Sequence, residues 1–188
     1  FIKKNTIGVS TARAGNVIGG GDWAKDRLIS DIMVAASQGK KVSIRNPHAT
    51  RPWQHVLEPL SGYLQIGQKL LQEKVEYGDA WNFGPSEDGS TSVEEVVKNV
   101  KDHWNNFEYE FNKELNQPHE ARLLKLDCAK ANKLLSWHMV WDNKKTFEKT
   151  VMWYKSFYEK QKVLTNFHLQ DYIGDAHSKG LSWTSNCK

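Results

Sequence analysis

The chain has 188 residues, with 26 lysines and arginines against 22 aspartates and glutamates, and 39% of its residues are hydrophobic. This length and composition fit one soluble globular domain or part of a larger one. The longest purely apolar stretch, Ile32 to Ala36, is far shorter than the roughly 20 residues of a membrane-spanning helix, and no signal-peptide layout opens the chain. We therefore expect a cytoplasmic protein that has no membrane partner.

The charges and cysteines exclude two further classes of function. The net charge of +4 is spread over interleaved basic and acidic residues, so no nucleic-acid partner is expected. Cys128 and Cys187 lie far apart, and neither a C-x-x-C nor an H-E-x-x-H spacing occurs, so we expect no disulfide framework and no metal site.

The start of the chain reads as the interior of a domain. Residue 1 is Phe, and residues 6–10 form an apolar run typical of a buried strand. A central strand without preceding sequence would leave an unpaired edge. We therefore expect the chain to be the later part of a longer protein.

The remaining elements alternate between helical and strand-like patterns, which predicts an α/β chain. Gly39 stands where a helix C-terminal cap belongs, and Ser92 with Glu95 has the S-x-x-E spacing of a capping box. Residues beyond about 162 are polar and are expected to be irregular. The predicted helices cover residues 27–38, 58–73, 93–104, 127–135 and 146–158, and the further strands cover 42–45, 80–83, 107–111 and 123–126.

Three loops carry groups that can hold an anion. The first, Gly15 to Arg27, is rich in glycine and precedes a helix N-terminus, so it is either a phosphate-binding loop or a plain turn. The second holds Arg45, His48 and Arg51, and the alternative for Arg51 is an ion pair with an acid such as Glu58.

The third loop, residues 118–122, places His119 near Arg122, and this histidine either orients a phosphate or lies on the surface. Asn82 at a strand end either contacts a ligand or completes a turn. The spacing predicts no Ser/His/Asp set and no acid/base pair of carboxylates. We therefore assign no catalytic residue from the pattern.

Taken together, these loops resemble those of the CDP-glucose 4,6-dehydratase family, which belongs to the extended short-chain dehydrogenase/reductases. The likeness covers about residues 6–160. It is carried by ARAGNVIGGGDW at 12–23, DRLI at 26–29, IRNPHATRPWQHVLEPLSGY at 44–63, WNFGP at 81–85, HEA at 119–121 and LKLD at 124–127. The second of the two long blocks is specific enough to favour this family over related sugar-nucleotide enzymes.

The resemblance implies an NAD-dependent conversion of CDP-glucose to CDP-4-keto-6-deoxyglucose. It also implies that the chain is only the C-terminal, substrate-binding part, with a remnant strand of the Rossmann sheet. NAD is then bound mainly by an upstream half, and the full-length protein is expected to be a homodimer. The glycine fingerprint and the Tyr-x-x-x-Lys pair of the family are expected upstream of Phe1 and not in this chain, so the chain alone is expected to be inactive.

The resemblance assigns site residues one by one. The expected substrate contacts are Asn16 and Arg51 at the diphosphate, Arg27 and Leu28 at the nucleotide end, Arg45 at the base or ribose, and His119 at the phosphate or ribose. Through its backbone, Ala14 is expected to lie near the nicotinamide of NAD.

The implied organisation has three parts: the end of a Rossmann domain at 1–22, a small α/β substrate-binding domain at 23–162, and a C-terminal tail at 163–188. Two alternatives remain open. One is a fragment of a related NDP-sugar epimerase or dehydratase, and the other is a non-catalytic module that binds a nucleotide sugar.

Overall fold

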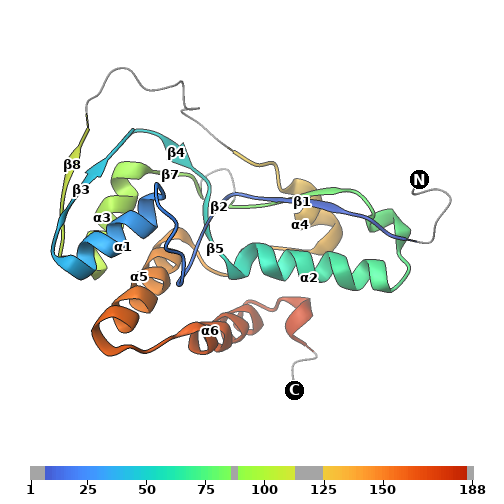
Figure 1. Cartoon of the computed structure of the whole chain (residues 1–188). Helices are drawn as coiled ribbons and strands as arrows, with labels where there is room; N and C mark the ends of the chain where they lie inside the picture. The colour runs from blue at the N-terminus through green and yellow to red at the C-terminus, as the bar shows by residue number, and fades with distance from the viewer. Residues whose placement is uncertain (1–6, 86–88, 113–124, 186–188) are drawn as a thin grey trace.

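The computed structural model describes residues 7–85, 89–112 and 125–185 (Figure 1). The strands are β1 (Thr11–Ala14), β2 (Asn16–Ile18), β3 (Lys41–Ile44), β4 (Thr50–Arg51), β5 (Trp53–His55), β6 (Ala80–Phe83), β7 (Thr91–Ser92) and β8 (Glu108–Phe111). The helices are α1 (Leu28–Gln38), α2 (Leu57–Leu71), α3 (Val93–His103), α4 (Ala129–Leu135), α5 (Asn143–Lys160) and α6 (Thr165–Ser178), with 3-10 turns η2 (Val75–Tyr77) and η4 (Ser182–Thr184).

The strands pair two by two, mostly in parallel. The pairs β1 with β6, β2 with β5, and β3 with β8 are parallel, and β4 with β7 is antiparallel. Parallel partners need long crossover connections, and here those connections contain helices. The predicted α/β class is therefore confirmed.

At one end of the molecule, α1, α3 and α5 pack together beside the β3–β8 pair (Figure 1). The start of α3 is fixed by the predicted capping box, in which Ser92 accepts from the Glu95 backbone and Glu95 accepts from the Ser92 backbone. Gly39 ends α1 with φ 61°, the left-handed conformation that a glycine adopts without cost. The core between these helices includes Ile32, Val97 and Phe147, all essentially inaccessible to solvent.

At the other end, α2 runs alongside the β1–β6 pair and α4 (Figure 1). Trp81 and Phe83 of β6 are fully buried together with Trp137. A smaller cluster joins Trp141 to Tyr172 of α6. The extended segment of β2 and β5 lies between the two ends and leads directly from one to the other.

Two predicted elements are wrong at the start of the chain and before α4. Residues 7–10 are not a strand, and Ile7 and Val9 are exposed. The strand begins only at Thr11, because its partner β6 begins at Ala80 after the η2 turn. The strand predicted at 123–126 is also not found: residues 125 and 126 are irregular, and 123 and 124 lie outside the described residues.

The region beyond residue 162 was expected to be irregular, and this prediction is wrong. The region contains α6 and η4. The helix buries His168, Tyr172 and Ala176, which stand four residues apart. Two of these three residues carry polar groups, so the apolar periodicity on which the prediction relied is weak. Among the residues that the structure describes, no helix is both long enough and apolar enough to cross a membrane.

Gly62 of α2 allows the helix to lie directly on the ring of Phe83. A Cβ at this position would stand 2.2 Å from Cε1 of Phe83, and Phe83 is fully buried. We expect Gly62→Ala to lower the free energy of unfolding by roughly 1–3 kcal/mol, because overpacking outweighs the better helix propensity of alanine. Urea unfolding measures this difference.

Gly67, on the same helix, provides the matched control. A Cβ there meets no atom within 4 Å, so Gly67→Ala is expected to stabilise the protein by about 1 kcal/mol or less. If Gly62→Ala were as stabilising as Gly67→Ala, the close packing of α2 on β6 would be contradicted.

Candidate functional site

A cavity with a volume of about 960 Å³ is open to solvent. It lies where β2 and the loop after it meet the start of α1, the end of β3 and the β4–β5 segment. Its lining is formed by Gly15, Asn16, Val17, Ile18, Gly19, Asp22, Asp26, Arg27, Leu28, Ile29, Ser30, Asp31, Val42, Ser43, Ile44, Arg45, Asn46, Ala49, Arg51, Trp53, Val93 and Tyr154.

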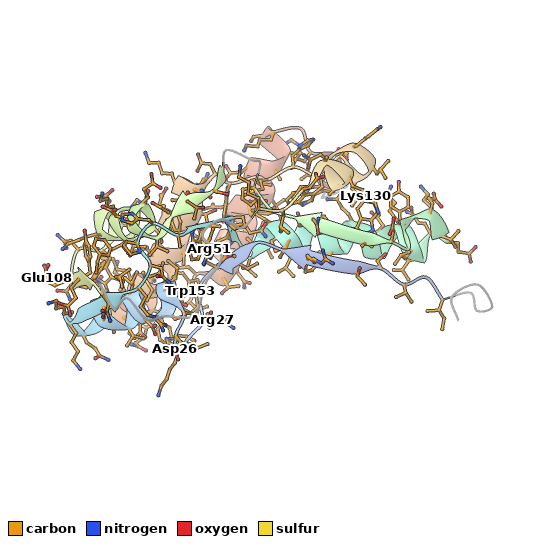
Figure 2. All side chains as sticks on the ribbon, turned by 90° about the horizontal axis from the view of Figure 1, so that it is seen from above. Asp26, Arg27, Arg51, Glu108, Lys130 and Trp153 are labelled. Carbon is orange, nitrogen blue, oxygen red and sulfur yellow. The ribbon has the colours of Figure 1, made fainter. Side chains whose placement is uncertain are left out.

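This cavity brings together five of the residues that the sequence predicted as substrate contacts, namely Asn16, Arg27, Leu28, Arg45 and Arg51. They come from segments up to 35 positions apart in the chain. In Figure 2 the labelled Arg27, Asp26 and Arg51 lie in the same central region, well away from Glu108 at one end of the molecule.

Arg51 is the most buried of the three arginines in the lining, with 9% of its surface exposed. It lies on β4, and its Nη1 donates to the carbonyl oxygen of Thr50 over 2.9 Å. The sequence alternative of a pair with Glu58 is not found: the Glu58 carboxylate accepts instead from the backbone of Val140 and Trp141 and from Tyr172. The hydrogen bond from Arg51 to Thr50 thus lies within its own strand, at the cavity wall.

Arg27 and Arg45 stand at the more exposed rim, each beside an aspartate. Arg27 Nη1 donates to Asp22 Oδ2 over 2.8 Å, and Arg45 Nη2 lies 3.8 Å from Asp26 Oδ1. Both arginine side chains are more than half exposed, so each pair contributes little to stability. Each aspartate gives the neighbouring guanidinium group a preferred orientation.

The helix N-terminus at this cavity is uncapped. Arg27 is the N-cap residue of α1 and makes no side-chain capping hydrogen bond. Residues 28–31 of the first turn line the cavity, and the Asp31 N–H already donates to the Arg27 carbonyl over 2.9 Å. The N–H groups of residues 28–30 and the positive end of the helix dipole are therefore placed at its wall. This arrangement favours an anionic ligand group near Leu28.

The loop between β2 and α1 is fastened to α5 by aromatic side chains. The backbone of Asp22 both donates to and accepts from the Tyr154 hydroxyl, over 2.9 and 2.6 Å. Trp23 packs on Trp153 and Phe157, with ring centroids 5.9 and 5.3 Å apart.

The glycines of this loop have different structural roles. A Cβ on Gly20 would stand 2.0 Å from the Trp153 ring, and Gly21 has φ 89°. Packing on α5 thus explains Gly20, and the turn explains Gly21. A Cβ on Gly19 would instead meet the side chain of Val56, at 2.9 Å.

The sequence interpretation missed four titratable residues of the lining: Asp22, Asp26, Asp31 and Tyr154. Burial raises the pKa of Asp31, the carboxylate of Asp26 raises it further, and Arg45 lowers it. Asp22 also feels burial, but hydrogen bonds from Ala24 and Arg27 outweigh it and lower its pKa. One signal in the sequence could have identified Asp31. It stands four residues after Arg27 at the start of a helix, and this spacing places both residues on the same face of the helix.

Other predicted residues lie elsewhere. Ala14 ends β1 immediately before the cavity-lining Gly15 and is not itself part of the lining. His119 falls outside the described residues. His48 does not line the cavity and instead lowers the pKa of Glu94 at the start of α3. Asn82 lies within β6 and does not line the cavity, and its Nδ2 donates to the distant Asp127 carbonyl over 3.0 Å, which is a tertiary contact and not a turn.

The Tyr-x-x-x-Lys spacing, expected only upstream of Phe1, does occur in this chain, at Tyr109 to Lys113 and at Tyr158 to Lys162. The sequence expectation was wrong on this point. Tyr109 lies on β8, and the Tyr158 hydroxyl accepts from Trp23 Nε1 over 2.9 Å. Neither tyrosine lines the cavity, so we assign neither a catalytic role.

Comparison with known proteins supports the resemblance drawn from the sequence. The chain is 43% identical over 173 residues to a CDP-glucose 4,6-dehydratase from Salmonella typhimurium, covering 91% of this chain and 48% of the relative. The chain thus spans about half the length of the curated relative it matches, in agreement with the C-terminal part predicted above. No protein-family model matches.

Solved structures show the same fold at low identity. The dTDP-glucose 4,6-dehydratase of Bacillus anthracis in complex with NAD aligns with a TM-score of 0.65 and 22% identity, over 85% of this chain and 48% of that one. The UDP-glucuronic acid 4-epimerase of Bacillus cereus aligns with a TM-score of 0.64 and 18% identity, over 83% and 48%. The chain therefore has the fold of one half of the extended short-chain dehydrogenase/reductases.

Proposed function

We propose that this chain forms the nucleotide-sugar-binding part of a CDP-glucose 4,6-dehydratase, an NAD-dependent enzyme that converts CDP-glucose to CDP-4-keto-6-deoxyglucose. The 43% identity to such an enzyme supports this. The observation that carries the proposal is the cavity in which Arg27, Arg45 and Arg51 meet the uncapped start of α1. A diphosphate needs several charge-assisted donors of this kind.

Burial and position support the roles that the resemblance suggests within the cavity. Arg51, being the most buried, is placed to hold the diphosphate together with Asn16 of β2. Arg27 and Leu28, at the helix start, are placed at the nucleotide end, and Arg45 at the base or ribose. His119 remains a proposed phosphate or ribose contact from the resemblance alone.

NAD supplies the transient oxidation at sugar C4 when it is bound. This chain offers one contact to it, the backbone at Ala14, where β1 ends beside the cavity. The groups that hold the rest of NAD and that move protons are proposed to belong to an upstream half. We accordingly propose that this chain alone is inactive, and that the full-length protein is a cytoplasmic homodimer.

Arg51→Ala tests the site. We expect the affinity for CDP-glucose to fall about 10- to 100-fold, because a charge-assisted hydrogen bond of about 1.5–3 kcal/mol is lost. A ligand that binds only the folded state raises the thermal midpoint, so a titration of that midpoint measures the loss. Arg51→Lys should recover only part of the affinity, since lysine lacks the planar fork of arginine.

Arg13→Ala is the control, because Arg13 is exposed on β1 and does not line the cavity. It should leave the response to CDP-glucose unchanged. An equal response of Arg51→Ala and wild-type protein would contradict the proposed site. If the chain alone shows no response, the titration is repeated on the gene product with the residues upstream of Phe1, and a continued absence of response contradicts the proposal.

The alternative of a related NDP-sugar epimerase or dehydratase is tested in the same titration. The structural neighbours include proteins named for dTDP-glucose and UDP-glucuronic acid, so the fold does not select the nucleotide. Tighter binding of a UDP or dTDP sugar than of CDP-glucose would favour that alternative. Binding of CDP-glucose by a full-length protein without turnover would favour a non-catalytic module.

A further inference from the structure

The carboxylates of the cavity need an explanation that the diphosphate does not provide. The lining holds three arginines and also three aspartates, so it is formally neutral. Asp22 and Asp26 stand beside Arg27 and Arg45 and orient them. Asp31 is the third aspartate, and a negative group at that place would only repel a phosphate.

Asp31 lies in the first turn of α1. The backbone of Asp26 is near enough to the Asp31 carboxylate to lower its pKa, although burial outweighs this effect. Asp26 has φ 62°, a left-handed conformation that costs free energy in a residue other than glycine and that often marks a functional site. The strained residue Asp26 therefore has its backbone near the Asp31 carboxylate.

Asp31 also lies close to Arg45, the residue proposed to contact the base or ribose. The two side chains line the same cavity, and they are near enough for Arg45 to interact electrostatically with the carboxylate. An acceptor and a donor therefore stand together at the part of the cavity assigned to the nucleotide. Arginine offers only donors, and an ionised aspartate offers only acceptors.

We propose, on the basis of the function proposed above, that Asp31 is a specificity-determining residue that accepts a hydrogen bond from the exocyclic amino group of cytosine. Cytosine presents the N4 amino group as a donor, whereas uracil and thymine present O4 as an acceptor at the same ring position. Opposite O4, the carboxylate of Asp31 would face a second acceptor with no proton between them. Asp31 thus selects CDP sugars and rejects UDP and dTDP sugars.

The test is the ratio of the dissociation constants of CDP and UDP, measured by calorimetric titration of the protein. We expect Asp31→Asn to reduce the preference for CDP about tenfold or more, because an amide can either accept from N4 or donate to O4. Asp22→Asn removes the same charge from the lining next to Arg27, and it should change the affinities for CDP and UDP by one common factor.

The outcomes separate this inference from the proposed function. Retained or improved UDP binding by Asp31→Asn shows that the variant is folded, and Asp31→Ser provides a second variant with a short hydroxyl. An unchanged CDP-to-UDP ratio in both variants, or an equal loss of both nucleotides, overturns the role of Asp31 and leaves the proposed function standing. Wild-type protein that binds neither nucleotide counts against both.

Discussion

Replacing Glu58 by alanine is expected to lower the free energy of unfolding by roughly 3–5 kcal/mol. The Glu58 carboxylate is fully buried, and it accepts hydrogen bonds from the backbone of Val140 and Trp141 over 3.0 and 2.8 Å and from the Tyr172 hydroxyl over 2.8 Å. It therefore ties α2 to the segment before α5 and to α6. Without it, three buried donors lose their acceptor.

Urea unfolding, followed by far-UV circular dichroism, measures the loss for Glu58→Ala. Glu159→Ala at the exposed end of α5 is the control, and it should change the stability by less than about 0.5 kcal/mol. The stability of Glu58→Gln should lie between those of Glu58→Ala and Glu159→Ala, because the glutamine amide keeps one acceptor oxygen. Equal stabilities of the Glu58→Ala and Glu159→Ala variants would contradict the anchoring role.

Acid is expected to destabilise the protein below about pH 6.5 through two buried histidines. Burial lowers the pKa of His55 to about 3 and that of His168 to about 4. Their rings lie 6.4 Å apart against Trp141, and Lys149 further disfavours their protonation. Below pH 6.5 the two histidines bind protons in the unfolded chain but remain neutral in the folded chain. The free energy of unfolding therefore decreases as the pH falls towards 4, by up to about 1.4 kcal/mol per pH unit for each histidine.

Glu58 has the opposite effect. Burial raises its pKa from 4.5 to about 7, so the folded state binds a proton that the unfolded state lacks in this interval. Its contribution to stability is present at low pH and is lost as pH rises from 4.5 through 7. Between pH 6.5 and 4.5 the two histidines outweigh the one glutamate, and the net expectation is a loss of stability on acidification.

The His168→Gln variant isolates one histidine. Its free energy of unfolding should fall less steeply with acid than that of the wild type, by up to about 1.4 kcal/mol per pH unit between pH 6.5 and 4. Chemical unfolding at a series of pH values measures the two slopes. His138→Gln, at an exposed position, should keep the wild-type slope. Parallel profiles for wild type and His168→Gln would exclude His168 as a source of acid lability.

Local signals in the sequence predicted the helices around the site. The spacing before Gly39 gave α1 to within one residue, and Ser92 with Glu95 gave the start of α3. These signals lie within a few residues of one another, so they act before any tertiary contact forms. The register of β1 on β6 could not be predicted, because it joins Thr11 to Ala80, and no local pattern encodes such a pairing.

The arginines of the candidate site were found from the chemistry of their loops and received their roles from the resemblance, but its aspartates were not found. Asp22 and Asp26 sit in an aperiodic loop, and their link to the arginines exists only in the folded chain. Tyr154 was missed because its spacing on α5 is that of a core residue. It is indeed buried, while its hydroxyl reaches the loop backbone of Asp22.

The fastening of the loop by α5 determines when the site is completed during synthesis. The ribosome makes the chain from its N-terminus, so the arginines are synthesised long before Trp153 and Tyr154. Until α5 has emerged, the loop of residues 19–27 has neither the hydroxyl of Tyr154 nor the ring of Trp153 to rest on. A nascent chain stopped before residue 154 therefore carries the arginines without the contacts that hold the loop, and the pocket is complete only after α5 has been made.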